Sequence, residues 1–132
     1  MPVWSSEALV VGTIYTRASL KEKFAITAAS LNNGIFQESG LDSIWLFITK
    51  NKTSDRTQYA DELVGDTLKM ESQPLGRLDV RLASHQETNT EILLFYRESK
   101  FQYAGAGFKF EGTFVHVSHT DVPPRKFVFQ RA

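Results

Sequence analysis

The chain has 132 residues, 42% of them hydrophobic, and its 15 lysines and arginines balance 15 aspartates and glutamates. This size and composition predict one globular domain over residues 1–132, with enough chain to bury a real core. The lack of cysteine excludes disulfides, thiolate zinc sites and a cysteine nucleophile, and the neutral total argues against indiscriminate binding of polyanions.

The sequence shows neither a signal peptide nor a membrane-spanning run. Its first residues lack a basic region followed by an apolar stretch, and no apolar run approaches the roughly 18 residues that a membrane span needs. Together with the lack of cysteine, these features favour a cytoplasmic protein with no membrane partner.

The first predicted helix lies within residues 16–30. Either Thr16 or Ser19 can act as its N-cap, and apolar residues follow one turn apart. The letters "NNG" mark the end of this region, and a second short helix over 27–32 is compatible with the pattern. The second helix would be too short and too weakly charged to read DNA as part of a helix-turn-helix.

Most of the remaining chain is predicted to form strands. Apolar runs, or an alternation of apolar and polar residues, identify these segments. They are residues 43–50, 76–85, 90–97, 108–119 and 126–130. Several strands joined by short connections predict a mainly β (α+β) fold, a curved sheet or partly open β-barrel with one or two N-terminal helices.

The segment 76–85 is predicted to be a half-exposed strand, followed by a hairpin loop over 85–89. Val80 would share its apolar face with two leucines. Arg77 and Asp79 would then lie together on the opposite face, where they can form an ion pair.

His116 and His119 are the first candidates for a metal site. They are three residues apart in a segment that alternates like a strand, and in a regular strand such residues point to opposite faces. No cysteine accompanies them. The pattern therefore favours exposed histidines over a zinc site, and no cofactor is predicted.

A Mg²⁺-dependent nuclease is one functional hypothesis. Glu98 and Lys100 follow an apolar run, and Asp79 lies upstream. Two carboxylates can hold Mg²⁺ while a lysine orients the attacking water. Because Glu-x-Lys is common by chance and the chain has few helices to flank such a core, a charged strand end is favoured. We expect no cleavage by the isolated domain.

DNA recognition is the preferred hypothesis, because basic, aromatic and amide side chains are interleaved in the predicted loops. Phosphates attract Lys and Arg, base edges pair with Gln, Asn, Asp and Arg, and an unpaired base stacks on an aromatic ring. A solvated surface, or one that binds another protein, is the competing interpretation. The candidate DNA-contacting residues are Lys50, Lys52, Arg56, Tyr59, Gln73, Arg77, Arg97, Lys100 and Tyr103, with Asp61 and Asp79 as orienting carboxylates.

The placement of charge follows from this hypothesis. A neutral protein must concentrate its positive charge to hold phosphates. We therefore expect five of the cations to lie on one face, and the polar stretch 56–79 to form part of the binding surface. The five are Lys50, Lys52, Arg56, Arg97 and Lys100.

Most of residues 15–115 resemble a bacterial module of unknown function that is associated with HNH endonucleases and, more distantly, with helicase–nuclease proteins of defence systems. The shared motifs are a Tyr-x-Asp after a lysine-rich strand end, a Gln-x-x-Gly-Arg-x-Asp turn, and a Leu-Phe-Tyr-Arg strand over 94–97. The residues that carry the first two motifs are Tyr59, Asp61, Gln73, Gly76, Arg77 and Asp79.

The resemblance implies a DNA-recognition domain of the barrel type that reads specific or modified bases. The HNH residues are absent, so it implies the specificity part of a restriction-modification or similar defence protein, without the catalytic half. The implied partners are duplex DNA, with a flipped or modified base, and a nuclease domain in the full-length protein. The motif residues would either contact DNA or hold their loop.

Overall fold

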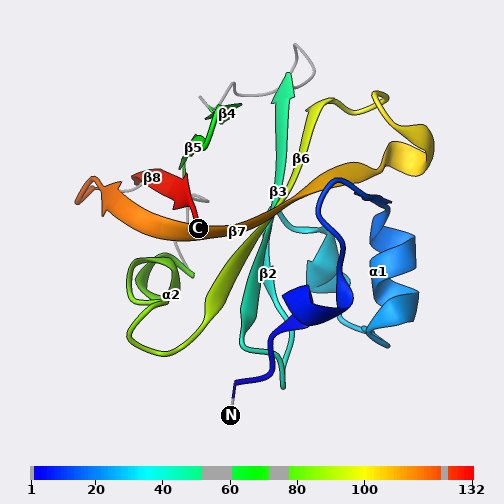
Figure 1. Ribbon diagram of the computed structural model, residues 1–132, viewed down its shortest axis with the longest axis horizontal. Coiled ribbons are helices and arrows are strands. Elements are labelled where there is room, and N and C mark those ends of the chain that lie inside the picture. Colours follow the sequence, from blue (N-terminus) through cyan, green and yellow to red (C-terminus); the bar gives the residue numbers. More distant parts are fainter. Residues whose placement is uncertain (1, 52–60, 72–77, 123–124) are drawn as a thin grey trace.

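The computed structural model describes residues 2–51, 61–71, 78–122 and 125–132 (Figure 1). As predicted, the fold is mainly β with a partly open sheet. In chain order its elements are η1 (Ser5–Ala8), β1 (Ile14–Tyr15), α1 (Arg17–Lys23), η2 (Ala29–Asn32), β2 (Ile35–Gln37), β3 (Ser43–Asn51), β4 (Glu62–Val64), β5 (Thr67–Glu71), α2 (Asp79–Ala83), β6 (Glu91–Ser99), η3 (Ala104–Ala106), β7 (Phe108–His119) and β8 (Lys126–Arg131).

The strands form one sheet in the order β2-β3-β6-β7-β8-β5-β4, with β1 added to β7. Strands β3 and β6 are parallel, and the other described pairs are antiparallel. The parallel register places Ser43 beside Glu91 at one end and Asn51 beside Ser99 at the other. The chain therefore leaves β3 and β6 at the same edge of the sheet.

Two apolar cores lie on opposite faces of β3 and β6. Ile44, Leu46 and Ile48 belong to the first core, whereas Trp45 and Phe47 belong to the second. A strand buried on both faces needs no polar side, which explains the unbroken apolar runs that were predicted to be strands.

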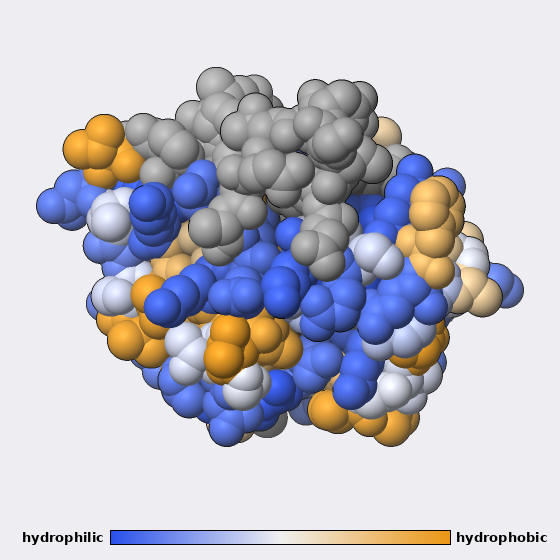
Figure 2. Space-filling model, turned by 90° about the horizontal axis from the view of Figure 1, so that it is seen from above, coloured by the Kyte–Doolittle hydropathy of each residue, from blue (hydrophilic) through white to orange (hydrophobic). Residues whose placement is uncertain are grey.

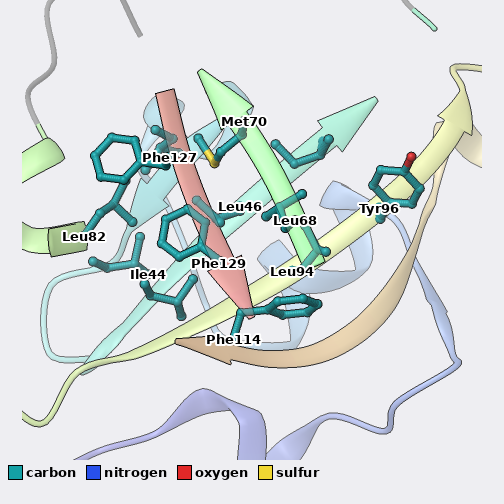
Figure 3. Close-up of a cluster of buried hydrophobic side chains, with 13 residues drawn as sticks. Ile44, Leu46, Leu68, Met70, Leu82, Leu94, Tyr96, Phe114, Phe127 and Phe129 are labelled. Atoms are coloured by element: carbon teal, nitrogen blue, oxygen red, sulfur yellow. The ribbon is translucent and has the colours of Figure 1, made fainter. Parts of the chain in front are cut away.

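The first core is enclosed by the sheet itself. Figure 3 shows β5 and β8 crossing over β3 and β6, with the buried side chains between them. Leu82 of α2 packs into the same cluster. The second core is covered by the N-terminal part of the chain, where Leu20 of α1 is fully buried. This curling of the sheet makes the domain barrel-like.

Helix α1 begins as predicted, with Thr16 as the N-cap. Its hydroxyl accepts a hydrogen bond from the Ser19 amide, and the Ser19 hydroxyl accepts one from the Thr16 amide, each at 3.0 Å. This reciprocal capping satisfies two N–H groups at the helix start. The helix is shorter than predicted because it ends at Lys23 and Ala25 takes a positive φ of 53°. None of the helices among the described residues is long and apolar enough to cross a membrane.

The prediction of a strand over 76–85 is wrong for residues 79–83, which form α2. Leu78 and Leu82 are one helical turn apart and pack into the first core, whereas Val80 is 77% exposed. Leucines at i and i+4 fit both a strand and a helix, and the burial of Leu82 selects the helix. The predicted hairpin loop at 85–89 therefore connects α2 to β6 instead.

The polar stretch 56–79 contains two strands, β4 and β5, that the sequence analysis missed. They form a hairpin whose turn includes Gly65 at φ 60°. Strand β5 also pairs with β8, and its Leu68 and Met70 are buried in the first core. The part of this stretch that forms β4 and β5 therefore belongs to the sheet and its core.

Strand β7 changes face at Gly112. Phe110 belongs to the second core, but Phe114 belongs to the first, although residues four positions apart in a regular strand point to the same face. The pairing with β6 shifts at this point, and Gly112 has a φ of 98°, which a residue with a side chain rarely adopts. This β-bulge lets one strand contribute to both cores.

Candidate nucleic-acid interface

The edge where β3 and β6 end gathers several of the predicted residues. We call the surface of Lys50, Glu98, Lys100, Phe101 and Tyr103 the strand-end surface. Lys50 Nζ lies 3.9 Å from a Glu98 carboxylate oxygen, and the loop after β6 carries the other three residues. Figure 2 views this end of the molecule and shows a largely hydrophilic surface with small hydrophobic patches around the residues drawn in grey.

Phe101 is the most exposed large apolar residue among those described, at 84%. The Lys100 ammonium lies 5.6 Å from the centre of its ring. Phe101 is not among the contacts predicted from the sequence, although an aromatic residue next to a lysine in a loop is a recognisable signal for such a contact. A free aromatic face beside a cation can stack on a base and hold a phosphate.

The loop that carries Phe101 is held closely against the N-terminal segment. A side chain at Gly107 would place its Cβ 2.8 Å from Ile14, and one at Gly105 would lie 3.0 Å from Thr16. Gly105 also has a φ of 66°. Glycine is favoured at Gly105 by the positive φ and at Gly107 because a Cβ atom would collide with the Ile14 side chain.

Arg97, a predicted DNA contact, is only 8% exposed. Its Nε donates to the Thr49 hydroxyl at 2.7 Å, its Nη1 donates to the Ala106 carbonyl at 2.8 Å, and its guanidinium lies 3.9 Å from the Phe108 ring centre. Burial, and the nearby Arg17, lower the pKa of Arg97. The side chain therefore ties the loop after β6 to β3, beneath the surface.

Lys50 is accessible, but acidic groups surround it. Its ammonium lies 3.4 Å from Glu62 and 3.9 Å from Glu98, in pairs whose side chains are 40–50% exposed. The hydrogen bond with Glu62, and the charge of Glu98, raise the pKa of Lys50. This pairing offsets positive charge on the strand-end surface.

A polar hollow of about 250 Å³ adjoins this surface. Its cations face acids: Lys109 lies 3.9 Å from Glu111, and Arg131 lies 2.8 Å from Asp66. The residues around it are Leu63, Gly65, Tyr96, Glu98, Gln102, Tyr103, Lys109, Glu111 and Arg131. Burial raises the pKa of Tyr96, so its hydroxyl stays protonated at neutral pH. The hollow suits a neutral, hydrogen-bonding group better than a phosphate.

Both predicted orienting carboxylates are buried. Asp61 accepts a hydrogen bond from the Glu71 amide at 2.9 Å and so closes the base of the β4–β5 hairpin. Asp79 accepts one from Arg125 at 2.8 Å, and its other carboxylate oxygen has no hydrogen-bond partner among the described residues. These contacts give both residues a role in holding the framework.

Five of the predicted contact residues lie outside the described residues. They are Lys52, Arg56, Tyr59, Gln73 and Arg77. Of the five cations expected on one face, Arg97 is buried, Lys50 and Lys100 belong to the strand-end surface, and the positions of Lys52 and Arg56 stay predictions, as does the role of 56–79 as a binding surface. A pair between Arg77 and Asp79 likewise stays a prediction.

The two carboxylates of the nuclease hypothesis, Asp79 and Glu98, have separate partners. Asp79 of α2 contacts Arg125, and Glu98 at the end of β6 contacts Lys50. In the described part of the chain, no three His, Asp or Glu side chains are placed to hold a metal ion together. These positions give the nuclease hypothesis no geometric support.

The prediction that His116 and His119 point to opposite faces is wrong. His116 Nε2 lies 2.8 Å from His119 Nδ1. The pairing of β7 with β8 shifts between His116 and Ser118, so this bulge brings the two imidazoles to one face. Sequence alternation alone does not reveal a bulge.

Comparisons with protein-family models and with curated proteins find no match for this chain.

Proposed function

We propose that this domain is a non-enzymatic DNA-binding module whose strand-end surface contacts DNA. The observation that carries this proposal is the exposed ring of Phe101 beside the Lys100 ammonium. Stacking of a base on an aromatic ring tolerates any sequence, and a nearby lysine adds attraction to the backbone.

The loop geometry supports a surface that is formed before the ligand arrives. Arg97 fixes the Ala106 carbonyl, and the pairing of Phe108 with Tyr15 holds the end of the loop beside β1. A loop that is already ordered loses less conformational entropy on binding. Phe101 therefore stays exposed on a rigid support.

The charge balance favours DNA with an unstacked base over a long run of duplex contacts. The cations Lys50, Lys109 and Arg131 are each paired with an acid, so these three are poorly placed to neutralise phosphates. A flipped or modified base offers a flat ring for Phe101 and hydrogen-bonding edges for the polar hollow. Because the sequence resembles modules associated with HNH endonucleases, we further propose that the domain is the specificity part of a bacterial restriction-type defence protein, whose nuclease domain lies elsewhere in the full-length protein.

Fluorescence anisotropy with labelled duplexes tests this proposal. The duplexes carry unmodified, methylated or hydroxymethylated cytosine, or one unpaired base, and each is measured at low and at high salt. We expect Phe101→Ala to weaken binding by about 5- to 150-fold, which corresponds to the ~1–3 kcal/mol of a base stacked on an aromatic ring. Phe101→Trp keeps a stacking face and should retain binding.

Two lysine variants distinguish a phosphate contact at the strand-end surface from nonspecific electrostatic attraction. Lys100→Ala should weaken all the duplexes alike and reduce the salt slope by about 1, as expected for one phosphate contact. Lys126→Ala removes an exposed cation at the start of β8 and should have little effect. Equal binding by wild type and Phe101→Ala would contradict the proposed surface, and no binding at low salt would favour a protein-interaction domain.

We expect the isolated domain to leave plasmid and linear DNA intact in Mg²⁺ or Mn²⁺, since Asp79 and Glu98 have separate partners. Gel analysis after prolonged incubation measures this. Cleavage that is lost in Glu98→Gln, but kept in the exposed control Glu87→Gln, would replace the binding proposal with the nuclease.

A further inference from the structure

We propose that His116 and His119 form a binding site for a divalent transition-metal ion of the Zn²⁺, Ni²⁺ and Cu²⁺ class. The two ring nitrogens that face each other are 2.8 Å apart. Two nitrogens bound to one ion at about 2.0–2.1 Å lie roughly 3 Å apart when the angle between the bonds is near 90–110°. The two nitrogens therefore already have nearly the spacing of two ligands of one ion, and a rotation of both rings is needed to direct their lone pairs at an ion that lies off the line between them.

Neighbouring aromatic rings hold both imidazoles in place. The His119 ring centre is 5.3 Å from that of Phe127, and the His116 ring centre is 6.1 Å from that of Phe129. Phe127 and Phe129 are themselves stacked and fully buried in the first core. Side chains already placed by packing lose little freedom when a metal binds.

The backbone at the bulge is fixed by a buried histidine. His85 accepts a hydrogen bond from the His116 amide through Nε2 at 3.0 Å, and its Nδ1 lies 2.9 Å from the Thr90 carbonyl. Nε2 therefore acts as the acceptor and Nδ1 as the donor. This pairing holds His116 in the register that turns its ring toward His119.

The donor atoms suit a transition-metal ion. Imidazole nitrogens prefer Zn²⁺, Ni²⁺ and Cu²⁺ to Mg²⁺ or Ca²⁺. His119 is exposed, so an ion can reach the pair from solvent.

Water or an added ligand fills the remaining coordination positions. In the part of the chain that the structure describes, no third His, Asp or Glu joins the pair. The site lies on the β7–β8 hairpin, whereas the proposed DNA contacts lie where β3 and β6 end (Figure 1). Metal binding is thus independent of the DNA proposal.

Thermal unfolding of the full chain without a polyhistidine tag tests this site. We expect Zn²⁺ or Ni²⁺ to raise Tm by about 5 °C when the free ion is at ten times its Kd, and Mg²⁺ to have no effect. Isothermal titration calorimetry gives the stoichiometry, expected to be one ion per chain.

Variants assign the site to the histidine pair. His119→Ala should abolish the metal-dependent shift and leave the metal-free Tm close to that of wild type, because its side chain is exposed. Val117→Ala alters a neighbouring exposed residue without removing a donor atom and should keep the shift. Wild-type metal affinity in His119→Ala, or no heat and no shift in the wild-type protein, would overturn the proposal.

Discussion

Arg97→Ala is expected to lower the free energy of unfolding by about 3 kcal/mol, through lost charge-assisted hydrogen bonds and a lost cation–π contact. The buried guanidinium bonds to Thr49 and to the Ala106 carbonyl and lies over the Phe108 ring. Its removal leaves these groups without their partner and frees the loop after β6. Denaturant unfolding followed by circular dichroism measures the loss.

Two further variants make this prediction specific. Arg97→Lys keeps the positive charge but loses the planar array of N–H donors, so its free energy of unfolding should lie between those of wild type and Arg97→Ala. Arg81→Ala removes an exposed arginine that bonds to Gln37, and it should cost less than about 1 kcal/mol. If Arg97→Ala costs no more than Arg81→Ala, Arg97 is not a structural anchor, and its predicted role as a DNA contact gains weight.

The second large effect concerns the ion pair between Asp79 and Arg125. Arg125→Ala is expected to lower stability by about 3 kcal/mol, because it removes the cation that the described residues provide for a buried carboxylate. The Asp79 side chain is only 4% exposed, whereas that of Arg125 is 30% exposed and can turn to water. Asp79→Ala should therefore lower the free energy of unfolding by less than Arg125→Ala does.

A double-mutant cycle measured by denaturant unfolding tests this asymmetry. The double variant should be no less stable than Arg125→Ala alone, because removing Asp79 also removes the unpaired charge. The cycle is needed because Arg125 has a further interaction besides its ion pair with Asp79. A double variant whose loss equals the sum of the single losses would show that the two side chains do not depend on each other.

The sequence by itself determined the buried strands and the start of the first helix. Residues 43–50 and 90–97 are apolar on both faces, and such a run has few stable environments other than the centre of a covered sheet. Thr16 at the start of α1 acts through contacts within four residues. Local patterns of this kind do not depend on distant parts of the chain.

Only the tertiary structure decided the details at the candidate sites. The bulges that turn β7 at Gly112 and bring His116 to His119 depend on pairing with other strands. Arg97 follows an apolar run and resembles an exposed strand end, yet Thr49 and Phe108 bury it. The sequence shows which residue types are present, but their exposure is set by partners that lie tens of residues away along the chain.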